Sequence, residues 1–428
     1  MGENLGLKIR NLRKQKGMTL KELAGDRVTA AQISSIENGK CNPSDELLSY
    51  IAEKLEVDVE YFTLTDRERM QKKFQKLMDE IALNFDKESI DEVLDRIKVY
   101  EENLDMLSDA QKGYYYYCFA KQSYFKEDYD KSFIDFSKAL VYYLKTNNYD
   151  IISDIYICLG NCSYFNNKYE IAFGYYKNSE ELIDKGISLD NIARTYYDLA
   201  LCSIALNRYT LSDVYLNKLK DFIKQNDWHN KEQYLPGIEM MQGNVDFKIK
   251  DAEDSFKRFE NAYKKYKLNS DFEGMLKAKN NMAVCLWESG KKEQAIQLFK
   301  DIIQCEKEIN KENIAFILDV YLNLIDCLLE MKILDETLNV INEAEGVMLK
   351  QNYEEGIIKI LMSRFDFLCK IKDYQRAEDY AFYALDFMEK CNREEQKVEL
   401  YIKLSQMYKN MGDNKQAIEY LLLSQNNK

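Results

Sequence analysis

Few residues in this sequence have the types and spacing that catalysis needs. The chain contains one histidine, His229, and a single imidazole cannot build a Cys/His or Ser/His/Asp arrangement. Cys158 and Cys162 are four residues apart, but no histidine or acidic cluster stands beside them to complete a metal site. The sequence has no Gly-rich phosphate loop and no HExxH or CxxC pattern. We therefore expect no enzymatic activity, no metal site and no cofactor.

The composition predicts an all-α protein. With 2 Pro and 16 Gly in 428 residues, the chain favours helices joined by short turns, and its length requires several domains or a repeat array. No stretch approaches the roughly 18 apolar residues that a membrane-spanning helix needs. The 10 cysteines are scattered, as is usual for reduced intracellular thiols. We expect a cytoplasmic protein without disulfides and without a membrane partner.

Charge is distributed unevenly along the chain. Residues 1–40 contain eight basic and four acidic side chains, a balance of +4, so the formal net charge of −13 leaves −17 for the remainder. A basic head can bind phosphates independently of an acidic body, because charges separated by more than a Debye length of about 8 Å are largely screened. Charge alone leaves two interpretations open, a nucleic-acid-binding head and an ordinary solvated surface.

The head also has the local pattern of short, capped helices. Apolar residues with a helical period precede Gly17, which can end a first helix in a left-handed conformation. Thr19 and Glu22 have the spacing of a capping box, which begins a second helix. Thr29 and Gln32 have the same spacing before a third helix.

A fourth helix is expected from Ser44, and a fifth ends near Phe62. Short second and third helices separated by a tight turn, inside a unit of five helices, are typical of a helix-turn-helix domain. Packing of these helices without DNA binding is the alternative.

Residues 5–62 resemble the phage-repressor (Xre) class of helix-turn-helix domains, with "GMTLKELA" and "ISSIENGK" at the positions of its two characteristic helices. The resemblance implies an internal ion pair between Arg13 and Glu37. Leu20 is a departure, because the family often has a phosphate-binding Gln there. The DNA contacts that the resemblance implies are Thr29, Asn38 and Lys40 to phosphates, and Ala30, Ala31, Gln32 and Ser35 in the major groove. These base-facing side chains are short, so one site alone should have modest specificity.

Small residues recur in pairs 12 positions apart through the rest of the chain. Successive pairs are 40 to 43 residues apart. The pairs are Ala120/Ser132, Gly160/Ala172, Ala200/Ser212, Gly243/Ser255, Ala283/Ala295, Ile325/Thr337, Phe365/Ala377 and Ser405/Ala417. This is the tetratricopeptide pattern of antiparallel helix pairs, with longer helices than the usual 34-residue repeat. About eight repeats should stack into a right-handed superhelix with a concave groove.

The repeat register also assigns the cysteines and the polar residues. Cys162, Cys202, Cys285 and Cys327 all follow the first small residue by two positions, which indicates core packing. Polar residues on each repeat's first helix should face the groove, where amides can hold a peptide backbone. The predicted peptide-binding residues are Lys121, Asn161, Arg194, Tyr197, Asp198, Asn244, Lys277, Asn280, Asn281, Asn323 and Asp326. The alternative is that these side chains merely cover a solvated helix face.

A phage-repressor-type head followed by tetratricopeptide repeats resembles the RRNPP family, the peptide-pheromone receptors of Gram-positive bacteria. The resemblance implies a homodimeric quorum-sensing transcription factor whose affinity for double-stranded DNA is controlled by a short linear signalling peptide. We assign residues 1–64 to the helix-turn-helix domain, 65–110 to a helical linker or atypical first repeat, and 111–428 to the repeats.

Two other functions remain open. Residues 65–110 lie where related phosphatases carry a helical bundle that binds a response regulator of a phosphorelay, so such a protein is a second candidate partner. A scaffold that assembles protein partners without regulated DNA binding is the third possibility. Removal of residues 1–64 distinguishes a transcription regulator from these two alternatives. A scaffold or a phosphatase should keep its activity, whereas a transcription regulator should lose it.

Overall fold

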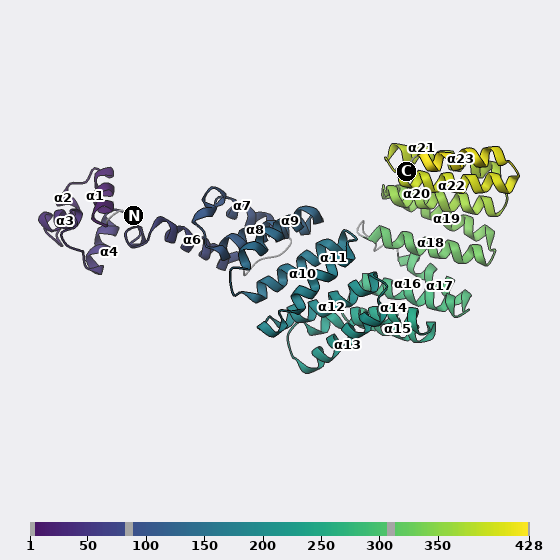
Figure 1. Cartoon of the computed structure of the whole chain (residues 1–428), viewed down its shortest axis with the longest axis horizontal. Helices are drawn as coiled ribbons and strands as arrows, with labels where there is room; N and C mark the ends of the chain where they lie inside the picture. The colour runs from purple at the N-terminus through teal and green to yellow at the C-terminus, as the bar shows by residue number, and fades with distance from the viewer. Residues whose placement is uncertain (1–4, 82–88, 306–312, 427–428) are drawn as a thin grey trace. The chain divides into compact units, whose positions relative to one another are not determined.

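The computed structural model describes residues 5–81, 89–305 and 313–426. These residues form helices and contain no β-strand, as the composition predicts. The chain divides into two compact units, Met1–Cys202 and Ser203–Lys428, and each is described by itself. Figure 1 labels most of the α-helices of both units.

The first unit begins with five short helices that share a core of their own. They are α1 (Leu5–Gln15), α2 (Leu20–Ala24), α3 (Ala30–Glu37), α4 (Asp45–Lys54) and α5 (Glu60–Thr63). Ile9, Leu23, Ile33 and Ile51 are fully buried between them. Gly17 has φ 69°, a left-handed conformation that favours glycine, and it ends α1 as the sequence predicts. The head is therefore a five-helix helix-turn-helix domain.

Three further helical segments connect this domain to the repeats. They are α6 (Asp66–Ile81), α7 (Ile90–Lys98) and the 3-10 helix η1 (Glu101–Met106). Phe74 of α6 and Leu94 and Ile97 of α7 are fully buried, and they share a cluster with Tyr115 and Cys118 of the next helix. Helices α6 and α7 thus pack against the first repeat helix, and the predicted domain boundaries stay predictions.

The repeats of the first unit are helical hairpins. The helices are α8 (Asp109–Phe125), α9 (Tyr129–Tyr143), α10 (Tyr149–Phe165), α11 (Tyr169–Glu180), η2 (Ile183–Lys185) and α12 (Leu189–Ala205), in which the division between the units falls. Figure 1 shows α8 beside α9 and α10 beside α11. Ser132 donates from its Oγ to the carbonyl oxygen of Ala120 at 2.9 Å, which joins one predicted small pair.

Glycine allows close helix contact in these hairpins. A Cβ placed on Gly160 would lie 2.3 Å from the ring of Tyr176, which is fully buried. Gly243 has the same relationship to Phe259 in the second unit, at 2.5 Å. In these two repeats the absence of a side chain on glycine leaves the space that the aromatic ring fills.

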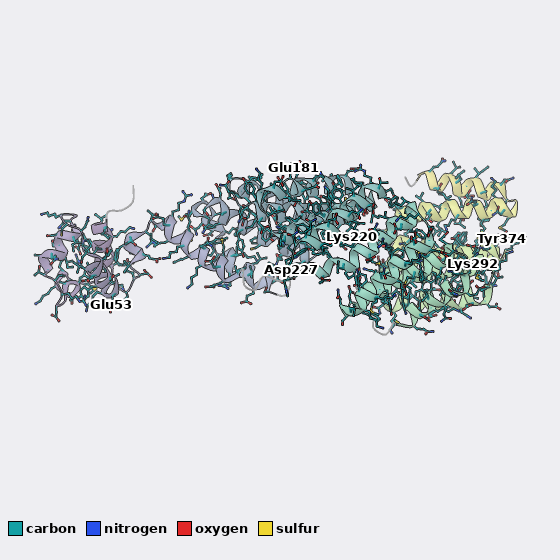
Figure 2. All side chains as sticks on the ribbon, turned by 90° about the horizontal axis from the view of Figure 1, so that it is seen from below. Glu53, Glu181, Lys220, Asp227, Lys292 and Tyr374 are labelled. Atoms are coloured by element: carbon teal, nitrogen blue, oxygen red, sulfur yellow. The ribbon has the colours of Figure 1, made fainter. Side chains whose placement is uncertain are left out.

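The second unit continues the hairpins. Its helices are α13 (Tyr209–Gln225), η3 (Lys231–Gln233), α14 (Tyr234–Ile249), α15 (Ala252–Leu268), α16 (Phe272–Glu288), α17 (Lys292–Gln304), α18 (Ile314–Glu330), α19 (Leu334–Lys350), α20 (Glu354–Lys370), α21 (Tyr374–Lys390), α22 (Glu394–Met411) and α23 (Asn414–Asn426). Buried apolar side chains from α16 to α23 form one hydrophobic cluster, and Figure 2 draws the side chains as sticks. Most of these helices have 16 to 18 residues, so the expectation of long repeat helices is confirmed.

Candidate DNA-binding and peptide-binding sites

An ion pair fixes the helix-turn-helix. Arg13 Nε donates to Glu37 Oε1 at 2.5 Å and Arg13 Nη2 to Glu37 Oε2 at 2.9 Å, while Nη1 donates to the carbonyl oxygen of Met18 at 2.7 Å. Both charged side chains are at most 10% exposed. The guanidinium of Arg13 therefore links α1 to the end of α3 and to Met18, which precedes the N-cap of α2. The predicted ion pair between Arg13 and Glu37 is confirmed.

Side-chain caps begin the helices of the motif. Thr19 and Glu22 form the predicted capping box at α2, with reciprocal hydrogen bonds between side chain and backbone. At α3, Thr29 Oγ1 accepts from the backbone N–H of Gln32 at 3.2 Å. The predicted second box is only half formed, because the side chain of Gln32 is exposed and makes no return bond within the part of the chain that the structure describes. Gln32 is thus left accessible to another molecule.

The predicted DNA contacts lie on the outer side of α3 and just beyond its end. Ile33 and Ile36 point into the core, whereas Ala31 is exposed and Ala30 and Ser35 are half-buried. Thr29, Asn38 and Lys40 are also exposed. Asn38 Nδ2 donates to the carbonyl oxygen of Ser34 at 2.7 Å, which holds its amide against the helix. All seven residues are thus at least partly exposed on α3 or next to its ends, and their DNA contacts stay predictions.

Leu20, the position that departs from the phage-repressor pattern, packs against the core of the domain. An apolar side chain here supplies no phosphate contact. The head therefore relies on the remaining polar residues for its interaction with a DNA backbone.

The polar residues on the first repeat helices of the first unit converge on one carboxylate that sequence reasoning missed. Arg194 Nη1 donates to Asp154 Oδ1 at 2.5 Å, and the hydroxyl of Tyr117 donates to Asp154 Oδ2 at 2.6 Å. Lys121 Nζ lies 3.6 Å from the same Oδ2 and 3.3 Å from Cys158 Sγ. Three successive first helices, α8, α10 and α12, therefore meet at Asp154.

Asp154 stands six residues before Gly160, the same register position as Arg194 in the next repeat. This position could have identified it as a groove residue. Burial acts to raise the pKa of Asp154, but the charges of Lys121 and Arg194 and the hydrogen bond from Tyr117 outweigh burial and hold the pKa well below its usual value. Asp154 is thus ionised and shared between two cations.

A hollow adjoins this cluster. It has a volume of about 270 Å³, and Tyr114, Tyr117, Ile151, Asp154 and Asn191 are among the residues that line it. Aromatic and apolar walls with the carboxylates of Asp150 and Asp154 and the side-chain amide of Asn191 can accept a mixed polar and apolar side chain.

Asp198 lies on α12, one turn beyond Arg194. Burial raises the pKa of Asp198 to about 7, and the nearby guanidinium of Arg194 lowers it only in part. Its carboxyl accepts no hydrogen bond within the described residues. Asp198 therefore exchanges a proton near neutral pH in a site that also contains two fixed cations.

The other predicted residues of the first unit are half-buried. Asn161 Oδ1 accepts from the hydroxyl of Tyr176 at 2.7 Å, so the amide oxygen is occupied while its N–H groups stay available. Tyr197 is half-buried on α12. Cys162 and Cys202 are fully buried, and burial raises the pKa of Cys162 to about 12, so their predicted role in packing is confirmed.

The second unit holds its own set of predicted residues. Asn323 Nδ2 donates to Asn280 Oδ1 at 3.4 Å, which links α16 and α18. Asn244 and Asn281 are half-buried, whereas Asp326 is exposed. Lys277 forms an ion pair with Glu273 of its own helix at 2.5 Å. The amides of this set are thus partly accessible, and their contact with a peptide stays a prediction.

The interior cysteines of the second unit also follow the register. Cys285 and Cys327 are 1% and 6% exposed, and burial raises the pKa of each to about 12. His229 is exposed between α13 and η3, away from any second histidine. Across the described ranges, no group of three or more His, Cys, Asp or Glu side chains is arranged to hold a metal ion. No helix among these residues is both long enough and apolar enough to span a bilayer.

Comparison with known proteins agrees with this architecture. The helix-turn-helix family matches residues 9–62, and the tetratricopeptide repeat family matches residues 398–425. No curated protein matches the sequence.

Solved structures show the same fold at low sequence identity. The apo form of the quorum sensor NprR from B. thuringiensis has a TM-score of 0.57 at 14% identity, over 90% of this chain and 97% of that chain. The apo form of RapI has a TM-score of 0.56 at 10% identity, over 83% and 97%. NprR in complex with its cognate peptide NprX has a TM-score of 0.51 at 16% identity, over 82% and 99%. The chain is a helix-turn-helix protein with tetratricopeptide-type repeats and the fold of NprR and RapI.

Proposed function

We propose that this protein is a cytoplasmic, homodimeric transcription regulator of the RRNPP family, which binds DNA through its head and a short signalling peptide on the polar face of its first repeat helices. The observation that carries the proposal is the convergence of α8, α10 and α12 on Asp154 in a chain that also presents an exposed α3. Neither interface requires a metal, a cofactor or catalysis. The solved complex of NprR with its peptide NprX supports the peptide part of the proposal.

The DNA interface combines phosphate donors with short base-facing side chains. The hydroxyl of Thr29 uses its oxygen as a helix cap and keeps its hydrogen for a phosphate oxygen. Lys40 is exposed and forms no ion pair in the described residues, so its charge is available to DNA. Two heads on adjacent half-sites supply the discrimination that one head lacks, which is why we propose a dimer.

Gel-shift titration with fragments from the region upstream of its own gene tests this interface. We expect one palindromic or directly repeated site to bind more tightly than the other fragments. The Lys40→Glu variant should bind all fragments more weakly and with a flatter salt dependence, as a phosphate contact requires. Lys54→Glu, on α4, is the control. Equal affinity of the wild-type protein for every fragment contradicts specific DNA recognition.

The proposed peptide interface has hydrogen-bond donors and acceptors on the first helices of the repeats. An extended peptide of about 5 to 10 residues can contact several of them, at roughly 3.3 Å per residue. Because Arg194 is charged, its replacement by Ala should weaken peptide binding by about 1.5–3 kcal/mol, and Asn281→Ala by about 0.5–1.5 kcal/mol.

Calorimetry tests the peptide interface with synthetic peptides that tile the C-terminal part of any short reading frame beside the gene. A peptide that binds is then titrated into variants with Ala at Asn161, Arg194, Asn244 or Asn281. Unchanged affinity in all four contradicts the assigned face. Fluorescence anisotropy of labelled operator DNA, with and without that peptide, measures whether peptide binding alters DNA affinity.

A second candidate function rests on residues 65–110. Lys73, Lys76 and Arg96 line a hollow of about 400 Å³ on α6 and α7, beside Val99, which is 71% exposed. Glu80 also lines the hollow and pairs with Arg96, so Lys73 and Lys76 supply its net positive charge. Such a surface fits an acidic protein partner, and a response regulator of a phosphorelay is the partner that we propose for it. A variant without residues 1–64 should retain binding to such a partner if this function, or a scaffold function, is correct.

A further inference from the structure

Arg364 interrupts the repeat pattern of the second unit. It directly precedes Phe365, the first member of a 12-residue pair, and this position is interior to the hairpin. The corresponding residues of six other repeats are apolar and that of the seventh is an amide: Phe119, Leu159, Leu199, Met282, Leu324, Leu404 and Gln242. A guanidinium at this position must have hydrogen-bonding or charged partners, because burial of an unpaired charge costs free energy.

The structure shows how Arg364 is held. It is 6% exposed, and its Nη2 donates to Asn342 Oδ1 at 2.7 Å and to the carboxylate of Glu345. Its guanidinium lies 5.0 Å from the ring centroid of Tyr380. Nε is buried without a partner, and Nη1 donates to no atom of the described chain. One buried guanidinium thus retains N–H groups that no protein acceptor uses.

Arg364 lines a hollow between α19, α20 and α21, three helices that pack in sequence (Figure 1). The hollow has a volume of about 400 Å³, within the range of roughly 300–1,000 Å³ of small-molecule sites. Leu338, Phe367, Leu368 and Ile371 form its apolar walls. None of the residues that line it belongs to the predicted peptide-binding set.

Charge restricts what the hollow can take. Arg376 adds a second guanidinium to its lining, and this guanidinium is paired with Asp373, the half-buried residue that caps α21. Asp335 also lines the hollow, is exposed and has no ion pair in the described residues. Glu345 and Asp373 each pair with one of the two guanidinium groups, so a ligand is left with only the N–H groups of Arg364 that have no protein acceptor. These N–H groups suit a single acceptor group, and Asp335 disfavours a ligand with more than one negative charge.

We propose that the hollow between α19, α20 and α21 binds a small amphipathic monocarboxylate. Its carboxylate accepts hydrogen bonds from Arg364, and its apolar part packs against Leu338, Phe367 and Leu368. Charge-assisted hydrogen bonds of this kind are about twice as strong as neutral ones, which makes the carboxylate the recognised group. The site is independent of peptide binding and of DNA binding.

Calorimetry on the full chain tests this site with butanoate, octanoate and phenylacetate, each compared with its neutral amide. At least one acid should bind, and its affinity should exceed that of the amide by about tenfold or more, as expected for loss of a charged hydrogen-bond partner. The absence of binding by all three acids at millimolar concentration overturns the proposal. Equal affinity of each acid and its amide also overturns it.

Variants locate the binding. Arg364→Met with Glu345→Gln restores an apolar side chain at the position and removes the carboxylate that would be left unpaired, so this double variant should fold and lose the preference for the acid. Leu338→Trp fills the hollow and should abolish binding of acid and amide alike. The matched control is Lys397→Met, which removes another buried cation, 8% exposed on α22, and should bind as the wild type does. Retention of the acid preference in the double variant contradicts the site.

Discussion

Asp154 on α10 accepts a hydrogen bond from Arg194 on α12 at 2.5 Å, so the first helices of two successive repeats are joined by an ion pair. Lys121 on α8 extends the link to a third helix. Each repeat of a tetratricopeptide array contacts only its neighbours, so such links control how one repeat is set against the next. A peptide that competes for Arg194 would act on this same link.

The ion pair should contribute measurably to stability. Asp154→Asn removes the charge that Lys121 and Arg194 share, and we expect the free energy of unfolding to fall by roughly 1–3 kcal/mol. Arg194→Met in the same chain should recover part of this loss, because one unpaired cation is then removed. Chemical unfolding followed by circular dichroism measures each variant. Asp221→Asn, which breaks an exposed pair with Lys224 at 4.0 Å, is the control and should cost under about 1 kcal/mol.

Asp198 should make stability depend on pH. Its pKa is raised to about 7 from a model-peptide value of 3.8, so the folded chain binds this proton more tightly than the unfolded chain does. Stability should therefore decrease as the pH rises from about 4 to about 7, and the loss should be complete above that window. Asp198→Asn should remove this part of the dependence and be more stable than the wild type at pH 8. Equal pH profiles of the two proteins between pH 4 and 8 would refute the assignment.

The ion pair between Arg13 and Glu37 should be essential for the stability of the helix-turn-helix domain. Arg13→Met leaves the carboxylate of Glu37 buried without its partner, and removing one member of such a pair typically costs about 3–5 kcal/mol. The double variant Arg13→Met/Glu37→Met should be less destabilised than either single variant. Thermal unfolding and DNA gel shift measure both consequences. Additive effects of the two substitutions would show that the pair is not coupled.

Glycine at the close contact of a repeat should be irreplaceable. Gly160→Ala places a methyl group against the ring of Tyr176, and overpacking of this kind costs about 1–3 kcal/mol. Gly174→Ala, on α11 with no atom within 4 Å of its Cβ, should instead stabilise the chain by up to about 1 kcal/mol through helix propensity. The opposite signs of the two melting-temperature changes form the test. A neutral Gly160→Ala would mean that Tyr176 can move without cost.

Much of the fold could be predicted because its determinants are local. The capping residues Thr19 and Ser44 begin helices where their side chains accept backbone N–H groups. The period of small residues identified Gly160 and Ala172 as one pair of a helical repeat, and the structure places both in the hairpin of α10 and α11. Patterns of this kind depend on residues that are close together in the sequence, so they can be recognised from one sequence alone.

The electrostatic partners were harder to predict. Asp154 and Arg194 are 40 residues apart, and only the stacking of repeats brings them together. Arg364 likewise depends on Asn342 of one helix and Tyr380 of another. Gln32 has the spacing of a capping box, but its side chain does not form the return hydrogen bond to the backbone of Thr29. The spacing allows this bond without requiring it. The chemistry of both sites therefore required the structure.

The core of the head has a consequence for the order of events during synthesis. Its buried residues run from Ile9 to Phe62, so every side chain that completes this core has been translated before the repeats begin. The head can therefore fold on the ribosome while most of the chain is still unmade. A premature stop within the repeats would then release a folded head without most of the repeats. Under the function proposed above, such a fragment would compete with the intact protein for the same DNA.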